Sequence, residues 1–158
     1  KEIKRNLLVA AQEVSAQRIK ASDVLSNAVT KEIQALSMPY ARFVIEVISP
    51  DYNAPKESDF TAYGCDEITM FIQSHKDAPL VPLAKGASGG EMSRIMLAVK
   101  AILAQYSKLP TLIFDEIDSG VSGEIAIKMG EIMEEMSHKM QIFAITHLPQ
   151  IAAKGKTI

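Results

Sequence analysis

The sequence predicts an α/β fold in which a long N-terminal helix and a small antiparallel β lobe precede a parallel strand–helix–strand core. Three observations predict it. Residues 1–36 contain neither Pro nor Gly, two segments between residues 41 and 75 have the composition of strands, and two short apolar runs between residues 111 and 147 flank a helical pattern.

Composition and charge match a globular domain without a strong electrostatic signature. Of the 158 residues, 47% are hydrophobic and 23% are charged, and the net charge is −2, so no overall basic surface for nucleic acid or an anionic membrane is expected. The single cysteine, Cys65, excludes an internal disulfide framework and fits a reducing compartment. Because the chain opens at Lys1 rather than Met, we expect a segment of a longer protein.

The first 36 residues predict one long helix that ends before Pro39. Its apolar and small side chains repeat with the 4-3 spacing of a heptad seam, which Gln17 interrupts: Ile3, Leu7, Ala10, Val14, Ala21, Val24 and Ala28. Such a seam suits either a helix packed on its own domain or the base of a coiled-coil arm, and both interpretations stay open. We expect the arm to cover residues 1–37 and the second domain to cover residues 38–158.

Two strands are expected after the helix. Residues 41–49 (ARFVIEVIS) and 67–75 (EITMFIQSH) are rich in β-branched and aromatic side chains, and a segment rich in Pro, Asn, Asp and Ser separates them. This pattern predicts an antiparallel sheet around a loop. Residues 76–87, which Pro79 and Pro82 interrupt, are expected to form a connector.

The second half of the chain predicts a helix followed by a βαβ unit. Residues 88–106 carry apolar positions at helical spacing, residues 111–116 (TLIFDE) and 141–147 (QIFAITH) are apolar runs, and residues 124–136 have a helical pattern. The two strands should be parallel and buried on both faces. The methionines at helical spacing are expected in the core.

Two polar residues and two glycines open the helix at residue 88. Ser88 and Glu91 fit the S-x-x-E capping box, in which each side chain binds the backbone N–H of the other residue. Gly89 and Gly90 fit a cap poorly, because a glycine in a helix costs about 1 kcal/mol relative to alanine. Bare backbone at a helix N-terminus also suits an anion such as phosphate. The tetrapeptide alone leaves both interpretations open.

Three side chains that can act on a phosphate are predicted at one edge of the parallel sheet. Asp115 and Glu116 end the first strand, and His147 ends the second. Ligands of parallel sheets bind outside the carboxyl ends of the strands. One carboxylate can hold Mg²⁺, the other can orient or deprotonate a water, and the imidazole can donate to a phosphate oxygen. The structural alternatives are solvated acids and a surface histidine, and His75 and His138 receive only that interpretation.

The order of these motifs resembles that of one protein family. "ASGGEMSRIMLA" resembles the signature motif of the ABC ATPase superfamily, "TLIFDE" its Walker B strand, "DSGVSG" its D-loop and "THLPQIA" its switch-histidine segment. Over residues 82–153 the run is most similar to the RecN family, bacterial DNA-repair ATPases of the SMC-like group, and Glu91 after the glycines fits that group. The region before residue 82 fits the returning coiled-coil arm and the lobe beneath it on pattern alone.

The resemblance implies the C-terminal part of an ABC/SMC-type ATPase head, cytoplasmic and associated with the nucleoid, with ATP and Mg²⁺ as cofactors. It implies a homodimer, through heads and coiled coil, that engages DNA double-strand breaks and has no membrane partner. Asp115 would serve the metal, Glu116 the attacking water and His147 the γ-phosphate. The residues implied to contact the partner subunit's ATP are Ser88, Gly89, Gly90 and Glu91, and those of the subunit-facing D-loop are Ser119, Gly120, Val121, Ser122 and Gly123.

The chain departs from the family pattern at two points. Ser122 stands where many ABC proteins carry the D-loop aspartate, which favours the RecN form over a transporter. The phosphate loop G-x-x-x-x-G-K-[ST] and the Q-loop are absent from the sequence. In the family they lie in the N-terminal part of the head, so the signature helix is implied to reach the ATP of a partner subunit, and this chain alone is expected to be inactive. The alternatives are another SMC-like or ABC-type ATPase and a non-enzymatic coiled-coil scaffold.

Overall fold

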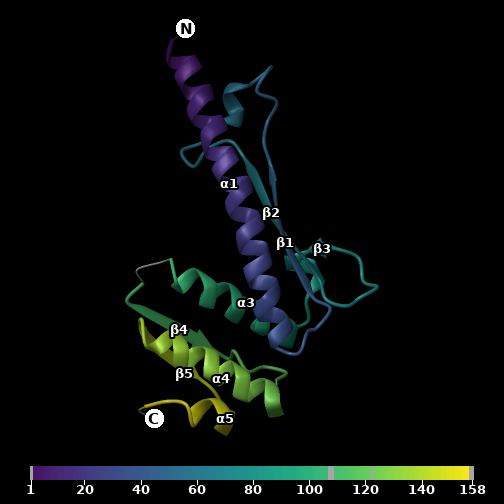
Figure 1. Ribbon diagram of the computed structural model, residues 1–158, viewed down its shortest axis with the longest axis vertical. Helices are drawn as coiled ribbons and strands as arrows, with labels where there is room; N and C mark the ends of the chain where they lie inside the picture. Colours follow the sequence, from purple (N-terminus) through teal and green to yellow (C-terminus); the bar gives the residue numbers. More distant parts are fainter. Residues whose placement is uncertain (1, 107–108, 122, 157–158) are drawn as a thin grey trace.

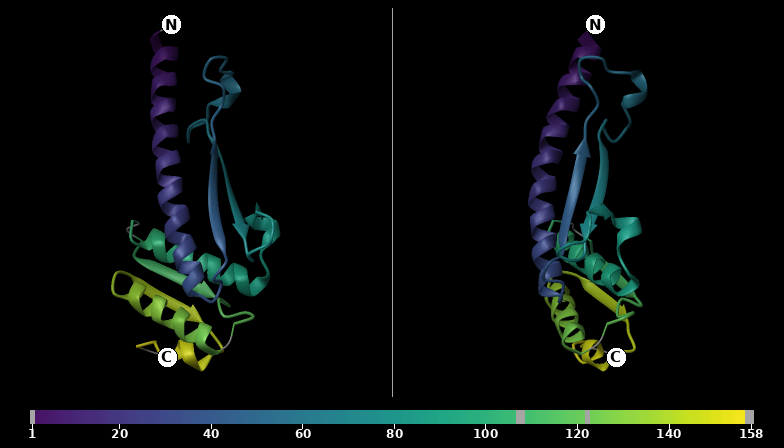
Figure 2. Two further views of the ribbon diagram at one scale, coloured as in Figure 1. Left: turned by 45° about the vertical axis from the view of Figure 1, so that its right-hand side comes forward. Right: turned by 90° about the vertical axis from the view of Figure 1, so that its right-hand side faces the viewer.

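The computed structural model describes residues 2–106, 109–121 and 123–156 (Figure 1). A long helix and a β lobe form a narrow upper part, and the parallel strands with their helices form a wider lower part (Figures 1 and 2). The predicted α/β class is confirmed. The elements are α1 (Glu2–Ala35), β1 (Arg42–Ile48), η1 (Glu57–Asp59), β2 (Glu67–Gln73), β3 (Val81–Pro82), α2 (Leu83–Gly86), α3 (Gly89–Ala104), β4 (Thr111–Asp115), α4 (Gly123–Ser137), β5 (Gln141–Ile145) and α5 (Pro149–Ala152). Among the described helices, none has the length and apolar character needed to cross a membrane.

The upper part consists of α1 and the sheet β1–β2–β3. β1 and β2 are antiparallel, from Arg42 opposite Gln73 to Ile48 opposite Glu67, as the sequence predicts. The segment that was expected to form a connector joins β2 to α3, and within it the two-residue strand β3 pairs with β2 and is followed by α2. Pro82 is tolerated there because β3 is an outer strand, where the missing N–H need not remove a ladder hydrogen bond.

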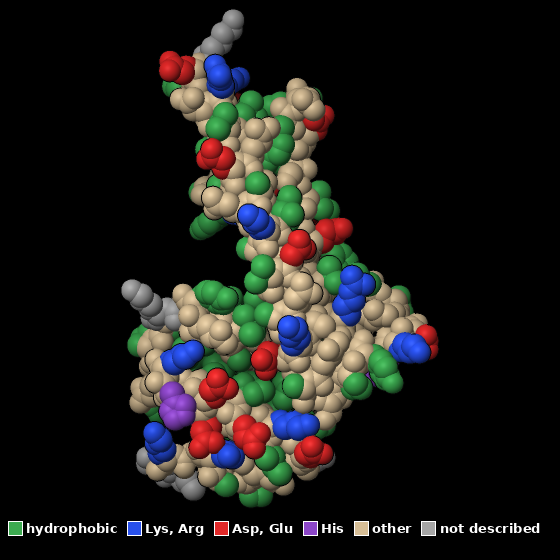
Figure 3. Space-filling model, viewed as in Figure 1, with side chains coloured by type: hydrophobic (Ala, Val, Ile, Leu, Met, Phe, Trp, Pro, Cys, Tyr) green, Lys and Arg blue, Asp and Glu red, His purple; other side chains and the backbone are tan. Residues whose placement is uncertain are grey.

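α1 does not bury the predicted heptad seam. The side chains that it buries are Ala11, Ser15, Ser22, Val29 and Ile33. The seam faces solvent over most of its length: Ile3 is 84% exposed, Val14 39% and Val24 63%. Hydrophobic side chains are visible along this part of the molecule in Figure 3. The helix therefore packs on its own domain through one face and leaves the apolar seam free on another.

Polar side chains of α1 close the outer edge of β1. The Thr30 hydroxyl accepts from the Phe43 N–H at 3.0 Å, and the Ser26 hydroxyl accepts from the Ile45 N–H at 2.9 Å. β1 is an outer strand of its sheet. Unpaired N–H groups on an outer strand can recruit another chain, so these two hydroxyls satisfy the edge and protect it.

A buried carboxylate joins the middle of α1 to the loop between β1 and β2. Asp66 accepts from Ser15 Oγ, from Arg18 Nη1 at 2.8 Å and from Ser49 Oγ at 2.8 Å. Burial would raise the pKa of Asp66, but these hydrogen bonds and the Arg18 charge outweigh it, and the pKa lies below its usual value. The carboxylate is therefore ionised at neutral pH and ties α1 to both ends of the loop.

The lower part contains the predicted βαβ unit. β4 and β5 are parallel, from Thr111 opposite Gln141 to Asp115 opposite Ile145, and α4 connects them. On one face of this sheet Phe114 is buried and Leu112 and Ile142 are partly buried, but on the other face Ile113 is 62% exposed, Phe143 51% and Ile145 60%. Burial on both faces is therefore wrong for the described residues, because α3 and α4 both pack on the face that carries Phe114.

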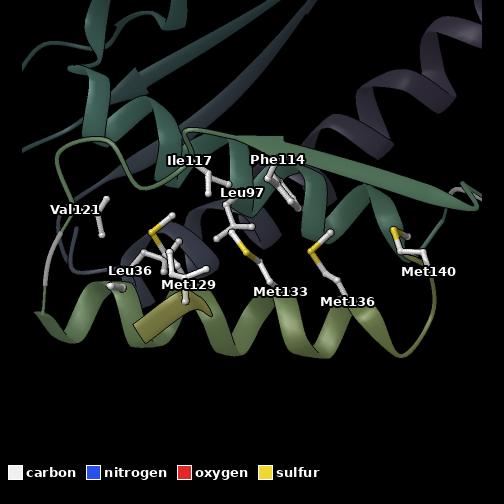
Figure 4. Close-up of a cluster of buried hydrophobic side chains, with 11 residues drawn as sticks. Leu36, Leu97, Phe114, Ile117, Val121, Met129, Met133, Met136 and Met140 are labelled. Carbon is white, nitrogen blue, oxygen red and sulfur yellow. The ribbon is translucent and has the colours of Figure 1, made fainter. Parts of the chain in front are cut away.

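α3 is shared by two hydrophobic clusters. Ile95, Ala98 and Ile102 pack in the upper cluster with the buried side chains of α1 and β1. Leu97 packs in the lower cluster with Phe114 and with four methionines that lie in the core as predicted: Met129, Met133, Met136 and Met140 (Figure 4). Since both clusters hold α3, its N-terminus has a fixed position relative to the end of β4.

Candidate functional site

The predicted capping box is present at the start of α3. The Ser88 N–H donates to Glu91 Oε2 at 2.9 Å, and the Glu91 N–H donates to Ser88 Oγ at 3.4 Å. Burial would raise the pKa of Glu91, but the bonds from Ser88 and the charges of His75 and Arg94 outweigh it and lower the pKa. The cap interpretation of Ser88 and Glu91 is confirmed.

The two glycines of this turn have different surroundings. A Cβ added to Gly90 would lie 3.1 Å from the carbonyl oxygen of Gly120 and 3.2 Å from that of Ser119, so the loop after β4 requires a bare backbone there. A Cβ added to Gly89 would meet nothing within 4 Å. Packing therefore explains Gly90, and neither packing nor capping explains Gly89.

The carboxyl end of β4 carries two exposed acids, Asp115 and Glu116. β5 ends at the same edge, because Asp115 pairs with Ile145 in the parallel register. Glu116 has a φ of 48°, in the left-handed region that residues other than glycine rarely adopt. Such strain costs on the order of 1–3 kcal/mol and is concentrated at functional sites. The conformation of Glu116 is therefore maintained by its surroundings.

Asp118, which the sequence did not single out, is the buried carboxylate of this edge. Its side chain is 0% exposed, and its Oδ2 accepts from the Thr146 hydroxyl and from the His147 N–H at 3.0 Å. His147 Nδ1 lies 3.4 Å from the same oxygen. Burial would raise the pKa of Asp118, but the hydrogen bonds from Thr146 and His147 outweigh it and lower the pKa. The only signal in the sequence was an aspartate in the turn "DSG".

The loop after β4 connects the candidate stretches. It contacts the first turn of α3 at Gly90, and its aspartate holds the turn that carries His147. The residues predicted for the D-loop divide by position: Ser119 and Gly120 lie against Gly90, Val121 is buried in the lower cluster, Gly123 begins α4 with a φ of 57°, and Ser122 lies outside the described residues.

Arg94 connects the start of α3 to the end of α1. Its Nε donates to the Gly90 carbonyl at 3.1 Å, and its Nη1 donates to the Leu36 carbonyl at 3.2 Å. Carbonyls at a helix C-terminus lack partners within the helix, so this bond satisfies one of them. The end of α1 and the first turn of α3 are therefore joined by one side chain.

Curated sequences similar to this chain are RecN DNA repair proteins. The protein of Streptomyces coelicolor is 39% identical over 90% of this chain, that of Haemophilus influenzae is 37% identical over 92%, and that of Vibrio cholerae is 34% identical over 96%. The chain spans about a quarter of the length of these relatives, from 25% to 26%. No family model matches the chain.

Solved structures with a similar fold are SMC head domains. The Smc head of Pyrococcus furiosus, with an extended coiled coil and bound to the C-terminal domain of ScpA, has a TM-score of 0.69 at 16% identity and covers 91% of this chain and 33% of that chain. The Smc head of Pyrococcus yayanosii, with a coiled coil and joint, has a TM-score of 0.68 at 15% identity and covers 87% of this chain and 24% of that chain. The chain therefore has the fold of an SMC head, and its sequence matches RecN DNA repair proteins over about a quarter of their length.

Proposed function

We propose that this chain is the part of a RecN-type ATPase head that meets a second head across bound ATP. ATP binding closes the two heads, hydrolysis releases them, and this cycle controls contact with DNA double-strand breaks. The observation that carries the proposal is a set of contacts at one edge of the parallel sheet. The unobstructed Gly89 begins α3, and the first turn of α3 contacts the loop that follows Glu116. Asp118 of that loop binds the turn that carries His147.

The start of α3 is proposed to contact the ATP of the partner head. The backbone N–H groups of a helix start favour an anion, and Gly89 leaves room for close approach. Ser88 and Glu91 keep the turn in shape through the capping box. Gly90 keeps the turn close to Ser119 and Gly120, which open the D-loop that is proposed to face the other subunit.

Asp115 is proposed to serve Mg²⁺, and Glu116 to orient the attacking water or take its proton. Both acids are exposed, as groups that a ligand reaches must be. Within the described ranges no three His, Cys, Asp or Glu side chains are grouped to hold a metal ion. That suits Mg²⁺, which commonly binds through one or two carboxylates together with phosphate oxygens and water. His147, 75% exposed, is proposed to donate to a γ-phosphate oxygen.

The free seam of α1 supports the assignment of residues 1–37 to a coiled-coil arm. An apolar stripe at 4-3 spacing that the domain leaves exposed suits a second helix. We propose that the homodimer forms through these arms and the heads, on the nucleoid in the cytoplasm. The chain contains no phosphate loop, so it is proposed to be inactive without the other parts of the protein.

Two alternatives would keep the same fold. The head of another SMC-like or ABC-type ATPase would keep the contact in trans but act on a different partner. A scaffold would use the arm and the head surface and would need no hydrolysis. The similarity to RecN proteins argues against the first alternative, and the unexplained Gly89 argues against the second.

Ser88→Arg in the full-length protein tests the proposal, with Ser88→Ala as its matched control. If the helix start contacts a partner's ATP, arginine blocks ATP-driven dimerisation and hydrolysis, while each separate head still binds ATP. Alanine removes only the cap, which costs about 0.5–2 kcal/mol of stability. A folded Ser88→Arg protein with normal turnover would leave only the cap or scaffold interpretation.

Mixing two defective subunits tests whether the contact is made in trans. A dimer of one Ser88→Arg subunit and one subunit without its phosphate-loop lysine retains one composite site in which both motifs are intact. Partial recovery of hydrolysis on mixing supports the proposal. Loss of nucleotide binding by an isolated, folded Ser88→Arg head would refute it, because the helix start would then act within its own subunit.

A further inference from the structure

Asp118 occupies a position in which a carboxylate is costly. Its side chain is 0% exposed, and its Oδ1 is buried without a hydrogen-bond partner in the described part of the chain. Burying an ionised carboxylate with one oxygen unpaired costs free energy that a neutral side chain would avoid. Packing alone therefore does not account for an aspartate at this point.

The carboxylate fixes the turn that follows β5. Asp118 Oδ2 accepts from the Thr146 hydroxyl and from the His147 N–H at 3.0 Å. The Thr146 hydroxyl oxygen in turn accepts from the Leu148 N–H at 3.0 Å. The Asp118 side chain, which comes from the loop after β4, thus holds the turn after β5 that consists of Thr146, His147 and Leu148.

The same carboxylate also faces the imidazole ring. His147 Nδ1 lies 3.4 Å from Asp118 Oδ2, while the His147 side chain is 75% exposed. A carboxylate offers only acceptors, so the favourable ring presents Nδ1–H to it. Nε2 is on the opposite side of the ring and is directed away from Asp118, where a ligand at the sheet edge can reach it.

We infer that Asp118 is a positioning residue, which holds the turn 146–148 and orients the His147 ring so that Nε2 faces the reacting phosphate. This inference rests on the proposed ATPase function. Asp118 directly precedes Ser119, which lies against Gly90. The orientation of the ring therefore depends on the loop that is also in contact with the start of α3.

A double-mutant cycle in the full-length protein tests whether Asp118 acts through His147. Asp118→Asn keeps the size and one acceptor oxygen but removes the charge. We expect kcat to fall about 10-fold, the scale seen when a histidine at a metal site loses its carboxylate partner, with ATP binding unchanged. In a His147→Ala background, Asp118→Asn should have no further effect. Additive losses in the double variant, or a normal kcat for Asp118→Asn, would overturn the inference.

Backbone hydrogen exchange gives a second readout that does not depend on hydrolysis. Asp118→Ala removes the acceptor of the His147 N–H, so a peptide covering residues 144–149 should exchange faster, while a peptide from β1 serves as control. Thr146→Val keeps that acceptor but removes the acceptor of the Leu148 N–H, so at the resolution of single amides it should affect Leu148 more than His147. Unchanged exchange in Asp118→Ala would show that Asp118 does not hold the turn. If the wild-type protein hydrolyses no ATP, the proposed function fails, and the exchange result still decides the positioning role.

Discussion

Replacing Gly89 and Gly90 by alanine, one at a time, separates folding from ligand contact at the start of α3. An added Cβ at Gly89 meets nothing within 4 Å, and neither glycine has a positive φ. Alanine is favoured over glycine in a helix by up to about 1 kcal/mol. Gly89→Ala should therefore leave the free energy of unfolding unchanged or raise it by up to about 1 kcal/mol.

Gly90→Ala should behave differently because its Cβ meets backbone. The distances to the carbonyl oxygens of Gly120 and Ser119 would be 3.1 and 3.2 Å. These are below the usual C···O contact of about 3.3–3.6 Å, so the loop must shift. Overpacking of this kind costs about 1–3 kcal/mol, which offsets the helix gain. We expect Gly90→Ala to be less stable than Gly89→Ala by about 1 kcal/mol or more.

Two assays on the full-length variants read the two effects separately. Urea unfolding compares the stabilities, and ATP-driven dimerisation with phosphate release measures function. We expect the urea midpoint of Gly89→Ala to be at least as high as that of the wild type. The variant should nevertheless lose ATP-driven dimerisation and hydrolysis, because the added methyl group enters the space proposed for a phosphate. A stable, fully active Gly89→Ala would refute the ligand contact. Equal stability of the two variants would refute the packing argument at Gly90.

Three further results are expected. Glu116→Gln in the full-length protein should retain ATP binding and lose phosphate release by about 10²-fold, the scale of a lost general base, and a wild-type rate would exclude Glu116 from that role. This chain alone should self-associate at micromolar concentration through the β4–β5 sheet, on which Phe143 is 51% exposed. Light scattering should show less association for Phe143→Lys than for the wild type, and a wild-type chain that stays monomeric throughout this range would contradict the prediction. Because the pKa of Asp66 is lower in the folded state than its unfolded value of about 3.9, its contribution to stability is complete above about pH 3.9 and is lost as the pH falls through the folded pKa. The free energy of unfolding measured against pH should therefore fall less on acidification for Asp66→Asn than for the wild type.

The features predicted correctly from the sequence depend on residues that are close in the chain. Ser88 and Glu91 are three positions apart, so their spacing alone predicts the capping box. The composition of residues 41–49 and 67–75 predicts antiparallel strands, and the order of the later motifs indicated the RecN family before the sequence matches confirmed it. Local patterns carry this information because propensity and capping are set within a few residues.

The features that were missed depend on contacts between distant residues. Asp118 is 28 and 29 positions from Thr146 and His147, and nothing in the sequence near it indicates that pairing. The apolar seam of α1 left a packed helix and a coiled-coil arm as open interpretations, and the lobe packs on a different face, which carries Ser15 and Ser22. The open face of the β4–β5 sheet was missed because an apolar strand does not reveal how many layers cover it.

α1 projects from the lower part of the molecule, with the β lobe packed along its side and with its support on α3 near its C-terminal end. Its 34 residues extend about 50 Å at roughly 1.5 Å per residue. Its contact with α3, and the bond from Arg94 to Leu36, lie at the C-terminal end, while the N-terminus is far from the lower part (Figure 2). A tilt of about 10° at that support moves a tip about 50 Å away by about 9 Å. At that support the Arg94 guanidinium donates to the Leu36 carbonyl and to the Gly90 carbonyl, so one side chain connects the base of the long helix to the first turn of α3.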